Sequence, residues 1–233
     1  MSPSLPSPFR FGITFLFHHL ISPVTESNCI LVAMSMSTHL KCVCVGDAAV
    51  GKTSMLMSHF TRNFPVDYIP GLFDNFETSL MAEHQNIALN VWDTEGRDGF
   101  ERVRPLSYAQ TDVFIVCYAV DSPTSLEHVT STWLPEIRHH CPNVPFVLVG
   151  TKSDLRRNAR YHERLRGGKL TFVDPELAKE VGKTLGASAV LECSAKTQLS
   201  IEDVLIGASK VALACRNKYK KKKKKKKTKC TLL

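Results

Sequence analysis

The chain has 233 residues, 43% of them hydrophobic, which is enough for one domain with a substantial core and short attachments. Its formal net charge at pH 7 is +8, but ten lysines lie between Lys218 and Lys229. Without those ten charges the net charge of +8 becomes −2, so the basicity belongs to a tail and the body is slightly acidic. This distribution argues against a folded nucleic-acid-binding surface, which would carry its positive charge on one face.

The eight cysteines are scattered along the chain, and none forms a C-x-x-C pair with another, which argues against a zinc site. Cys42 and Cys44 lie within one apolar run, and Cys117 lies within a second. We therefore expect small, buried thiols in a reduced, cytosolic protein.

Residues 1–38 differ in composition from the rest of the chain. They begin with the Pro/Ser-rich MSPSLPSPFR and continue with an apolar run from Phe11 to Ile21, which is too short to span a bilayer. We expect this segment to be disordered, or to be an extension from an upstream start. A targeting role is the less favoured alternative.

An apolar run from Leu40 to Val45 predicts a buried strand, and the octet GDAAVGKT follows it at once. This octet fits the phosphate-binding pattern G-x-x-x-x-G-K-[ST], whose glycines let consecutive N–H groups point at phosphate oxygens. In this pattern Lys52 reaches the β- and γ-phosphates, and the Thr53 hydroxyl binds Mg²⁺. The sequence therefore predicts a nucleotide site. Its phosphate-binding residues are Gly46, Asp47, Ala48, Ala49, Val50, Gly51, Lys52, Thr53 and Ser54.

Two runs after the predicted helix from Lys52 to Phe60 indicate an antiparallel strand pair, Phe76 to Met81 and Asn86 to Asp93. A strand that ends in Asp downstream of a phosphate loop is where such enzymes place the carboxylate that holds Mg²⁺. We therefore predict that Asp93 and Thr53 form the metal site. The alternative for Asp93 is an ordinary turn residue at a strand end.

Strands and helices then alternate, which predicts an α/β domain with a mostly parallel sheet wrapped on both faces. The run VFIVCYAV is continuously apolar, as is typical of a parallel strand covered on both sides. We assign this domain to residues 39–215 and a basic tail to 216–233. The predicted strands are Val113–Val120, Pro145–Gly150 and Ala189–Glu192. The predicted helices are Ser125–His140, Asp174–Gly186 and Ile201–Cys215, and the first of them is either kinked or started late around Pro135.

The order of phosphate loop, strand-end Asp, TKSD and SAK resembles that of the small GTPases. Residues 151–154 are similar to the family's [NT]-K-x-D guanine motif, because the Asp154 carboxylate can accept from guanine N1–H and the 2-amino group, which adenine lacks. The resemblance implies GTP/GDP and Mg²⁺ as ligands. It implies a P-loop NTPase fold with a six-stranded sheet and one antiparallel edge strand. The further nucleotide-binding residues that it implies are Phe64, Gly96, Thr151, Lys152, Asp154, Ser194, Ala195 and Lys196.

Within the small GTPases, residues from about Leu40 to Leu233 resemble the Rho/Rac family in FDNF, RPLSY, TDVFIVCY, HHCP and LVGTKSDLR. The segment from Asn158 to Lys169 falls where that family carries an extra helical insert. The resemblance implies a monomeric signalling switch that regulates the cytoskeleton and binds no nucleic acid. Its implied partners are effectors, exchange factors and dissociation inhibitors of Rho/Rac type, with effectors engaged through residues about 64–76 and 94–108.

Four positions around the γ-phosphate depart from the family pattern. Ala48 replaces a glycine and crowds the space needed by the water-orienting glutamine, while Arg97 stands where that glutamine belongs. We therefore assign no catalytic residue. Glu95 replaces an alanine and adds a negative charge, and Gly71 replaces the threonine that completes Mg²⁺ coordination. We expect a poor hydrolase that still binds guanine nucleotide, either locked in its GTP-bound state or insensitive to GTP.

The basic tail ends in CTLL, a C-a-a-X terminus that favours geranylgeranylation of Cys230. One prenyl chain anchors marginally, and each lysine near anionic lipid adds about 1 kcal/mol. We expect a lipid anchor at the cytoplasmic face of a membrane, the plasma membrane first, beside a cytosolic pool. We expect the tail to be disordered away from the membrane because its lysines repel one another. Nuclear localisation or RNA binding is the less favoured alternative for the lysine run.

Two other functions remain as alternatives to the switch. One is a non-cycling protein that holds guanine nucleotide structurally and competes for effectors or regulators. The other is a P-loop ATPase or kinase, which the TKSD motif disfavours.

Overall fold

The computed structural model describes residues 37–65, 74–166 and 171–230, with the backbone alone for 164–166 and 220–230. Within these residues six strands form one sheet in the order β2-β3-β1-β4-β5-β6, and only the edge pair β2–β3 is antiparallel. This confirms the predicted sheet. The strands are β1 Thr38–Val45, β2 Asn75–Ala82, β3 Gln85–Trp92, β4 Val113–Ala119, β5 Phe146–Thr151 and β6 Ala189–Glu192.

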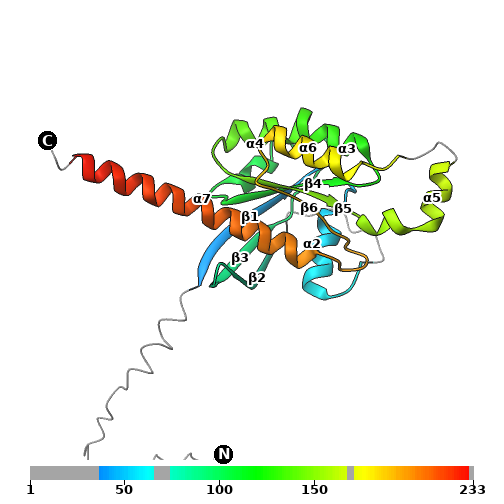
Figure 1. The fold of residues 1–233 in the computed structure, drawn as a ribbon, viewed down its shortest axis with the longest axis horizontal. Helices are drawn as coiled ribbons and strands as arrows, with labels where there is room; N and C mark the ends of the chain where they lie inside the picture. Colours follow the sequence, from blue (N-terminus) through cyan, green and yellow to red (C-terminus); the bar gives the residue numbers. More distant parts are fainter. Residues whose placement is uncertain (1–36, 66–73, 167–170, 231–233) are drawn as a thin grey trace, which may run out of the picture. The chain divides into compact units, whose positions relative to one another are not determined.

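Helices cover both faces of the sheet (Figure 1). Those on one face are α2 Lys52–Thr61 and α7 Ile201–Cys230, and those on the other are α3 Pro123–His128, α4 Leu134–His140 and α6 Pro175–Leu185. A further helix, α5 Ala159–Arg166, lies at one end of the domain, and it falls within the predicted insert. Three-ten helices span Arg104–Tyr108 and Ser153–Arg157.

The two cores follow from the alternation of side chains along each strand. In β1, Cys42 and Cys44 face the core beneath α2 and α7, whereas Val43 and Val45 face the core beneath α3, α4 and α6. All seven residues of β4 are buried, because helices cover this central strand on both sides. Cys42, Cys44, Cys117 and Cys193 are buried free thiols, as expected of Cys42, Cys44 and Cys117 from the sequence.

The helix boundaries follow local capping chemistry. The Asp174 side chain accepts a hydrogen bond from the Glu176 backbone N–H, and α6 ends at Gly186, which has a φ of 77°. The predicted interruption near Pro135 is also present, as a π-helical turn, Val129–Trp133, between α3 and α4. Proline lacks an N–H donor, so a regular hydrogen-bond ladder cannot continue through that position.

The last helix is longer than predicted. We expected α7 to end at Cys215 and the following residues to be disordered, but the helical backbone continues to Cys230. That expectation was wrong for residues 216–230 because it counted the repulsion between lysines and neglected the good helix propensity of lysine. In the described part of the chain, no helix is both long enough and apolar enough to cross a membrane.

Several predictions fall on residues that the structure does not describe. Residues 1–36, Gly71 and 167–169 lie outside the described ranges, as do the three residues after Cys230.

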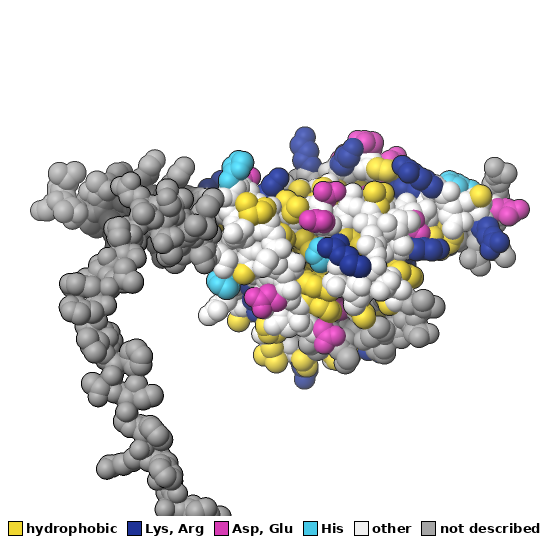
Figure 2. Space-filling view, turned by 90° about the horizontal axis from the view of Figure 1, so that it is seen from below, with side chains coloured by type: hydrophobic (Ala, Val, Ile, Leu, Met, Phe, Trp, Pro, Cys, Tyr) yellow, Lys and Arg dark blue, Asp and Glu magenta, His cyan; other side chains and the backbone are white. Residues whose placement is uncertain are grey.

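The described chain enters β1 at Thr38, one residue before the predicted start of the domain. Figure 2 shows acidic and basic side chains interspersed over the visible face of the described residues.

Candidate nucleotide-binding site

A cavity of about 270 Å³ lies at the carboxyl ends of the parallel strands, where α/β sheets bind their ligands. The segments that follow β1, β3, β5 and β6 form its walls together with α2 and the segment after it. The described residues that line it are Ala48, Ala49, Gly51, Lys52, Thr53, Ser54, Met55, Met57, Phe64, Pro65, Thr94, Glu95, Thr151, Lys152, Asp154, Leu155, Ala195 and Lys196.

The loop after β1 requires glycine at both ends of its turn. Gly46 and Gly51 have φ angles of 143° and 105°, and a Cβ on Gly46 would lie 2.3 Å from the carbonyl oxygen of Cys117. Lys52 Nζ donates to the carbonyl oxygens of Gly46 at 2.7 Å and Asp47 at 2.8 Å, so the ammonium is held against the loop. Burial lowers the pKa of Lys52, while the carboxylates of Asp93 and Glu95 oppose that shift.

A buried carboxylate and a hydroxyl meet beside this loop. Thr53 Oγ1 donates to Asp93 Oδ2 at 2.5 Å, and Asp93 Oδ1 is buried with no hydrogen-bond partner among the described residues. Burial raises the pKa of Asp93 to about 6. An unpaired carboxylate oxygen next to a hydroxyl fits the preference of Mg²⁺ for oxygen ligands.

The rest of such a coordination shell would come from water and phosphate oxygens. Over the described ranges, no cluster of three or more His, Cys, Asp or Glu side chains could hold a metal by itself. Mg²⁺ keeps several waters and commonly uses one or two carboxylates together with substrate phosphates. Thr53 and Asp93 would therefore suffice as its protein ligands.

The guanine motif lies at another end of the cavity. Asp154 Oδ1 accepts a hydrogen bond of 2.6 Å from Ser194 Oγ, which orients the carboxylate. Thr151 Oγ1 contacts the carbonyl oxygens of Val50 and Tyr118, so the motif is tied to the phosphate loop through the interior. An oriented carboxylate beside an open cavity can accept two hydrogen bonds from one edge of a base.

Residues 41–213 match the model of the Ras family. The chain belongs to the Ras family. Its fold is accordingly the P-loop fold of the small GTPases, with the six-stranded, mostly parallel sheet described above. Members of this family are GTP-binding switches that bind GTP or GDP together with Mg²⁺.

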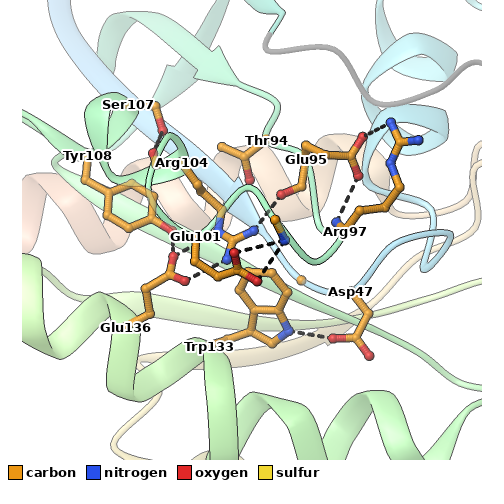
Figure 3. A network of polar contacts seen from close by, with 12 residues as sticks. Asp47, Thr94, Glu95, Arg97, Glu101, Arg104, Ser107, Tyr108, Trp133 and Glu136 are labelled. Atoms are coloured by element: carbon orange, nitrogen blue, oxygen red, sulfur yellow. Dashed lines mark hydrogen bonds and ion pairs between the residues drawn. The ribbon is translucent and has the colours of Figure 1, made fainter.

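An ion pair between Glu95 and Arg97 lies beside the phosphate loop, at one end of the cavity. The Glu95 carboxylate accepts from Arg97 Nη2 at 2.7 Å and from the Arg97 backbone N–H at 3.0 Å (Figure 3). Burial alone would raise the pKa of Glu95, but the hydrogen bonds and charge of Arg97 lower it below its ordinary value. Glu95 is therefore ionised at neutral pH.

A second ion pair, between Arg104 and Glu136, holds the backbone at Glu95. Arg104 is 2% exposed, donates to both carboxylate oxygens of Glu136 at 2.9 and 2.7 Å, and donates from Nη1 to the Glu95 carbonyl at 2.7 Å. The Tyr108 hydroxyl also donates to Glu136 (Figure 3). A bidentate, buried guanidinium fixes direction as well as charge, so the position of Glu95 is set by the fold.

The Asp47 side chain turns away from the cavity. Trp133 Nε1 donates to its Oδ1 at 2.6 Å, and His128 Nδ1 lies 2.7 Å from its Oδ2. The Arg104 guanidinium lies 4.4 Å from the centroid of the Trp133 ring. Trp133 therefore contacts both Asp47 and Arg104. Asp47 thus positions the phosphate loop and contributes its backbone to the site.

The structure brings most of the predicted site residues to the cavity wall. Six of the predicted residues are not among the described residues that line it: Gly46, Asp47, Val50, Asp93, Gly96 and Ser194. The supporting residues His128, Trp133, Glu136 and Arg104 were not predicted from the sequence. No local pattern indicates them, because each acts across a distance in sequence, up to 86 residues between Asp47 and Trp133.

Proposed function

We propose that this protein is a membrane-anchored guanine-nucleotide-binding switch of the Rho/Rac type, which binds GTP and GDP with Mg²⁺ and hydrolyses GTP slowly. The observation that carries the proposal is the cavity that joins the phosphate loop to the guanine motif, with Lys52 and Asp154 both in its lining. A site of this composition suits a ligand that has a phosphate chain and a purine.

The preference for guanine depends on Asp154. Its carboxylate is oriented by Ser194 and lines the cavity together with Lys152 and Ala195. Asp154 is half-buried, and a base seated on it would exclude water from the carboxylate. Adenine would then be penalised, since it offers no donors to pair with the carboxylate oxygens. The exposed ring of Phe64, which also lines the cavity, offers an apolar edge for the base.

Slow hydrolysis is supported by the residues next to the phosphate loop. Ala48 places a methyl group in the cavity wall. Arg97 supplies only hydrogen-bond donors and is paired with Glu95, so it cannot accept a proton from an attacking water. Both features act against the orientation of the attacking water, which is part of the positioning that such a reaction needs from the protein.

The Rho/Rac type is supported by the insert and by the exposed surface of the segment after β3. Helix α5 occupies the region in which the resembling family carries its extra helix. Leu106 and Val103 are 78% and 45% exposed on the segment 94–108. Exposed apolar side chains of this kind suit effectors, exchange factors or dissociation inhibitors.

Membrane anchoring is supported by the tail. The lysines from Lys218 onward follow an amphipathic part of α7 and precede the CTLL terminus. A cationic segment next to a prenylated Cys230 supplies the two signals that stable anchoring needs. We place the prenylated protein on the cytoplasmic face of an anionic membrane, beside a cytosolic pool.

A non-cycling protein that holds guanine nucleotide and competes for regulators is the second candidate. The observation that favours it is the buried carboxylate of Glu95 in the cavity wall, which would oppose a change of state on binding GTP. The two candidates share the site and differ in whether the bound nucleotide turns over.

The test begins with the nucleotide released from purified protein. A mixture rich in GTP supports the slow switch, GDP supports the non-cycling protein, and ATP would contradict both. Affinities for GDP and ADP are then measured by competition, and equal affinities would overturn the proposal. Binding of prenylated protein to vesicles with and without anionic lipid, compared with Cys230→Ser, tests the anchor.

A further inference from the structure

The cavity has an acidic wall at the end that a longer phosphate chain would reach. Asp154, Lys152 and Ala195 mark the base end, and the phosphate loop extends from there to Ala48 and Glu95. A nucleotide with its base at Asp154 therefore presents its last phosphate toward Glu95. Each added phosphate brings more negative charge toward this carboxylate.

The Glu95 side chain has little room to withdraw. It is 4% exposed, and Arg104 Nη1 holds its backbone carbonyl at 2.7 Å. The next residue, Gly96, packs so closely on the phosphate loop that a Cβ there would lie 2.2 Å from the carbonyl oxygen of Gly46. The segment therefore cannot move toward the loop.

Arg97 balances Glu95 from the outside. Its side chain is 48% exposed, and it is not among the described residues that line the cavity, whereas Glu95 lines it. A ligand in the cavity thus lies beside Glu95, whereas Arg97 stands outside the lining. The pair is neutral in total, but the near charge dominates at short range because the far one is screened by water.

We propose that the Glu95–Arg97 pair makes this cavity select nucleoside diphosphates over triphosphates, with Glu95 repelling the third phosphate and Arg97 reducing that repulsion. The inference rests on the proposed binding of guanine nucleotide. Of the two candidate functions it favours the second, the non-cycling protein, because a cavity that prefers GDP would respond weakly to GTP.

The experiment measures the dissociation constants of GDP and of the non-hydrolysable imido analogue of GTP by competition, in Mg²⁺ buffer, for the full chain. The variants are Glu95→Gln, Arg97→Gln and the double variant. The matched control is Glu101→Gln, because Glu101 is an exposed carboxylate of the same segment that hydrogen-bonds the Gly99 N–H. The quantity compared is the ratio of the two dissociation constants.

The wild type should prefer GDP, and Glu95→Gln should reduce this preference about tenfold, as expected for one partly screened charge. Arg97→Gln should increase the preference several-fold, because the carboxylate loses its counter-ion. In the double variant the ratio should match that of Glu95→Gln, and Glu101→Gln should match the wild type. Retained binding of GDP shows that each variant is folded.

An unchanged ratio in Glu95→Gln would overturn the proposal while the protein still binds guanine nucleotide. A further loss of triphosphate affinity when Arg97→Gln is added to Glu95→Gln would also overturn it, because Arg97 would then contact the phosphate directly. Failure of the wild type to bind either guanine nucleotide would overturn the proposed function itself.

Discussion

The base end and the phosphate end of the cavity hold their key carboxylates by different means. Asp154 is oriented by a neutral hydroxyl, that of Ser194, so its charge remains available to a ligand. Glu95 is matched with the cation of Arg97, and its backbone is held by a second cation, Arg104. The carboxylate at the base end is therefore free to accept hydrogen bonds from a base, whereas the carboxylate at the phosphate end is already paired with a cation of the protein.

This difference separates recognition of the base from a conformational response to the third phosphate. Residues that read the base need only a fixed acceptor, which a hydroxyl and a packed backbone provide. A response to the third phosphate needs a segment that can change its contacts when that phosphate is present. In this protein the segment after β3 already has its contacts satisfied by Arg104 and the Glu95–Arg97 pair. Four experiments test this difference between the two ends of the cavity.

The largest expected effect is at the base end. Asp154→Asn should reduce the preference for GDP over ADP by about 10³-fold, because an amide cannot accept both hydrogen bonds from guanine. Competition binding measures this preference. Glu180→Gln removes a charge from an exposed site on α6 and serves as the control. A preference that survives in Asp154→Asn would mean that the base is read elsewhere.

The next effect is on the support of the phosphate end. Glu136→Gln leaves the buried Arg104 without its ionic partner, and we expect the free energy of unfolding to fall by about 3 kcal/mol. Urea denaturation measures the change. Glu127→Gln, on the exposed side of α3, should leave stability within about 0.5 kcal/mol of the wild type. Equal stabilities of the two variants would show that the network does not support the fold.

The metal site should produce a pH dependence. The pKa of Asp93 is raised from 3.8 to about 6 in the folded protein, so the folded state binds more protons than the unfolded state between these values. Stability of metal-free protein should therefore fall as pH rises through this window, by about 3 kcal/mol from Asp93. Denaturation in a chelator at pH 4 and pH 7 measures the fall. The fall should shrink in Asp93→Asn, and an equal fall in that variant would assign it to other groups.

The smallest effect is on turnover. Arg97→Gln should hydrolyse GTP about tenfold faster than the wild type in a single turnover, because an amide can orient water and arginine cannot, while the Ala48 methyl still limits the gain. Arg97→Ala is the control, since it removes the arginine without supplying an amide. If Arg97→Ala were as fast as Arg97→Gln, relief of the ion pair rather than water orientation would explain the gain.

Sequence patterns alone predicted the elements that depend on neighbours along the chain. The phosphate loop follows from two glycines and a lysine at fixed spacing, and α6 follows from Asp174, Pro175 and Gly186. The α/β class follows from apolar strands that alternate with helices. The end of α7 was missed because its length depends on a balance between helix propensity and charge repulsion, which no local stop signal decides.

The nucleotide pattern, the guanine motif and the positions that depart from the family can be read from the residues alone, since each is a residue type at a fixed place. How those departures act depends on contacts made in the folded protein. The fold pairs Arg97 with Glu95 at the cavity wall, holds the Glu95 carbonyl with Arg104, and joins Asp47 to Trp133 across 86 residues. These contacts depend on the packing of elements that are separate in the sequence. The sequence therefore shows which charges are present, but not which of them pair.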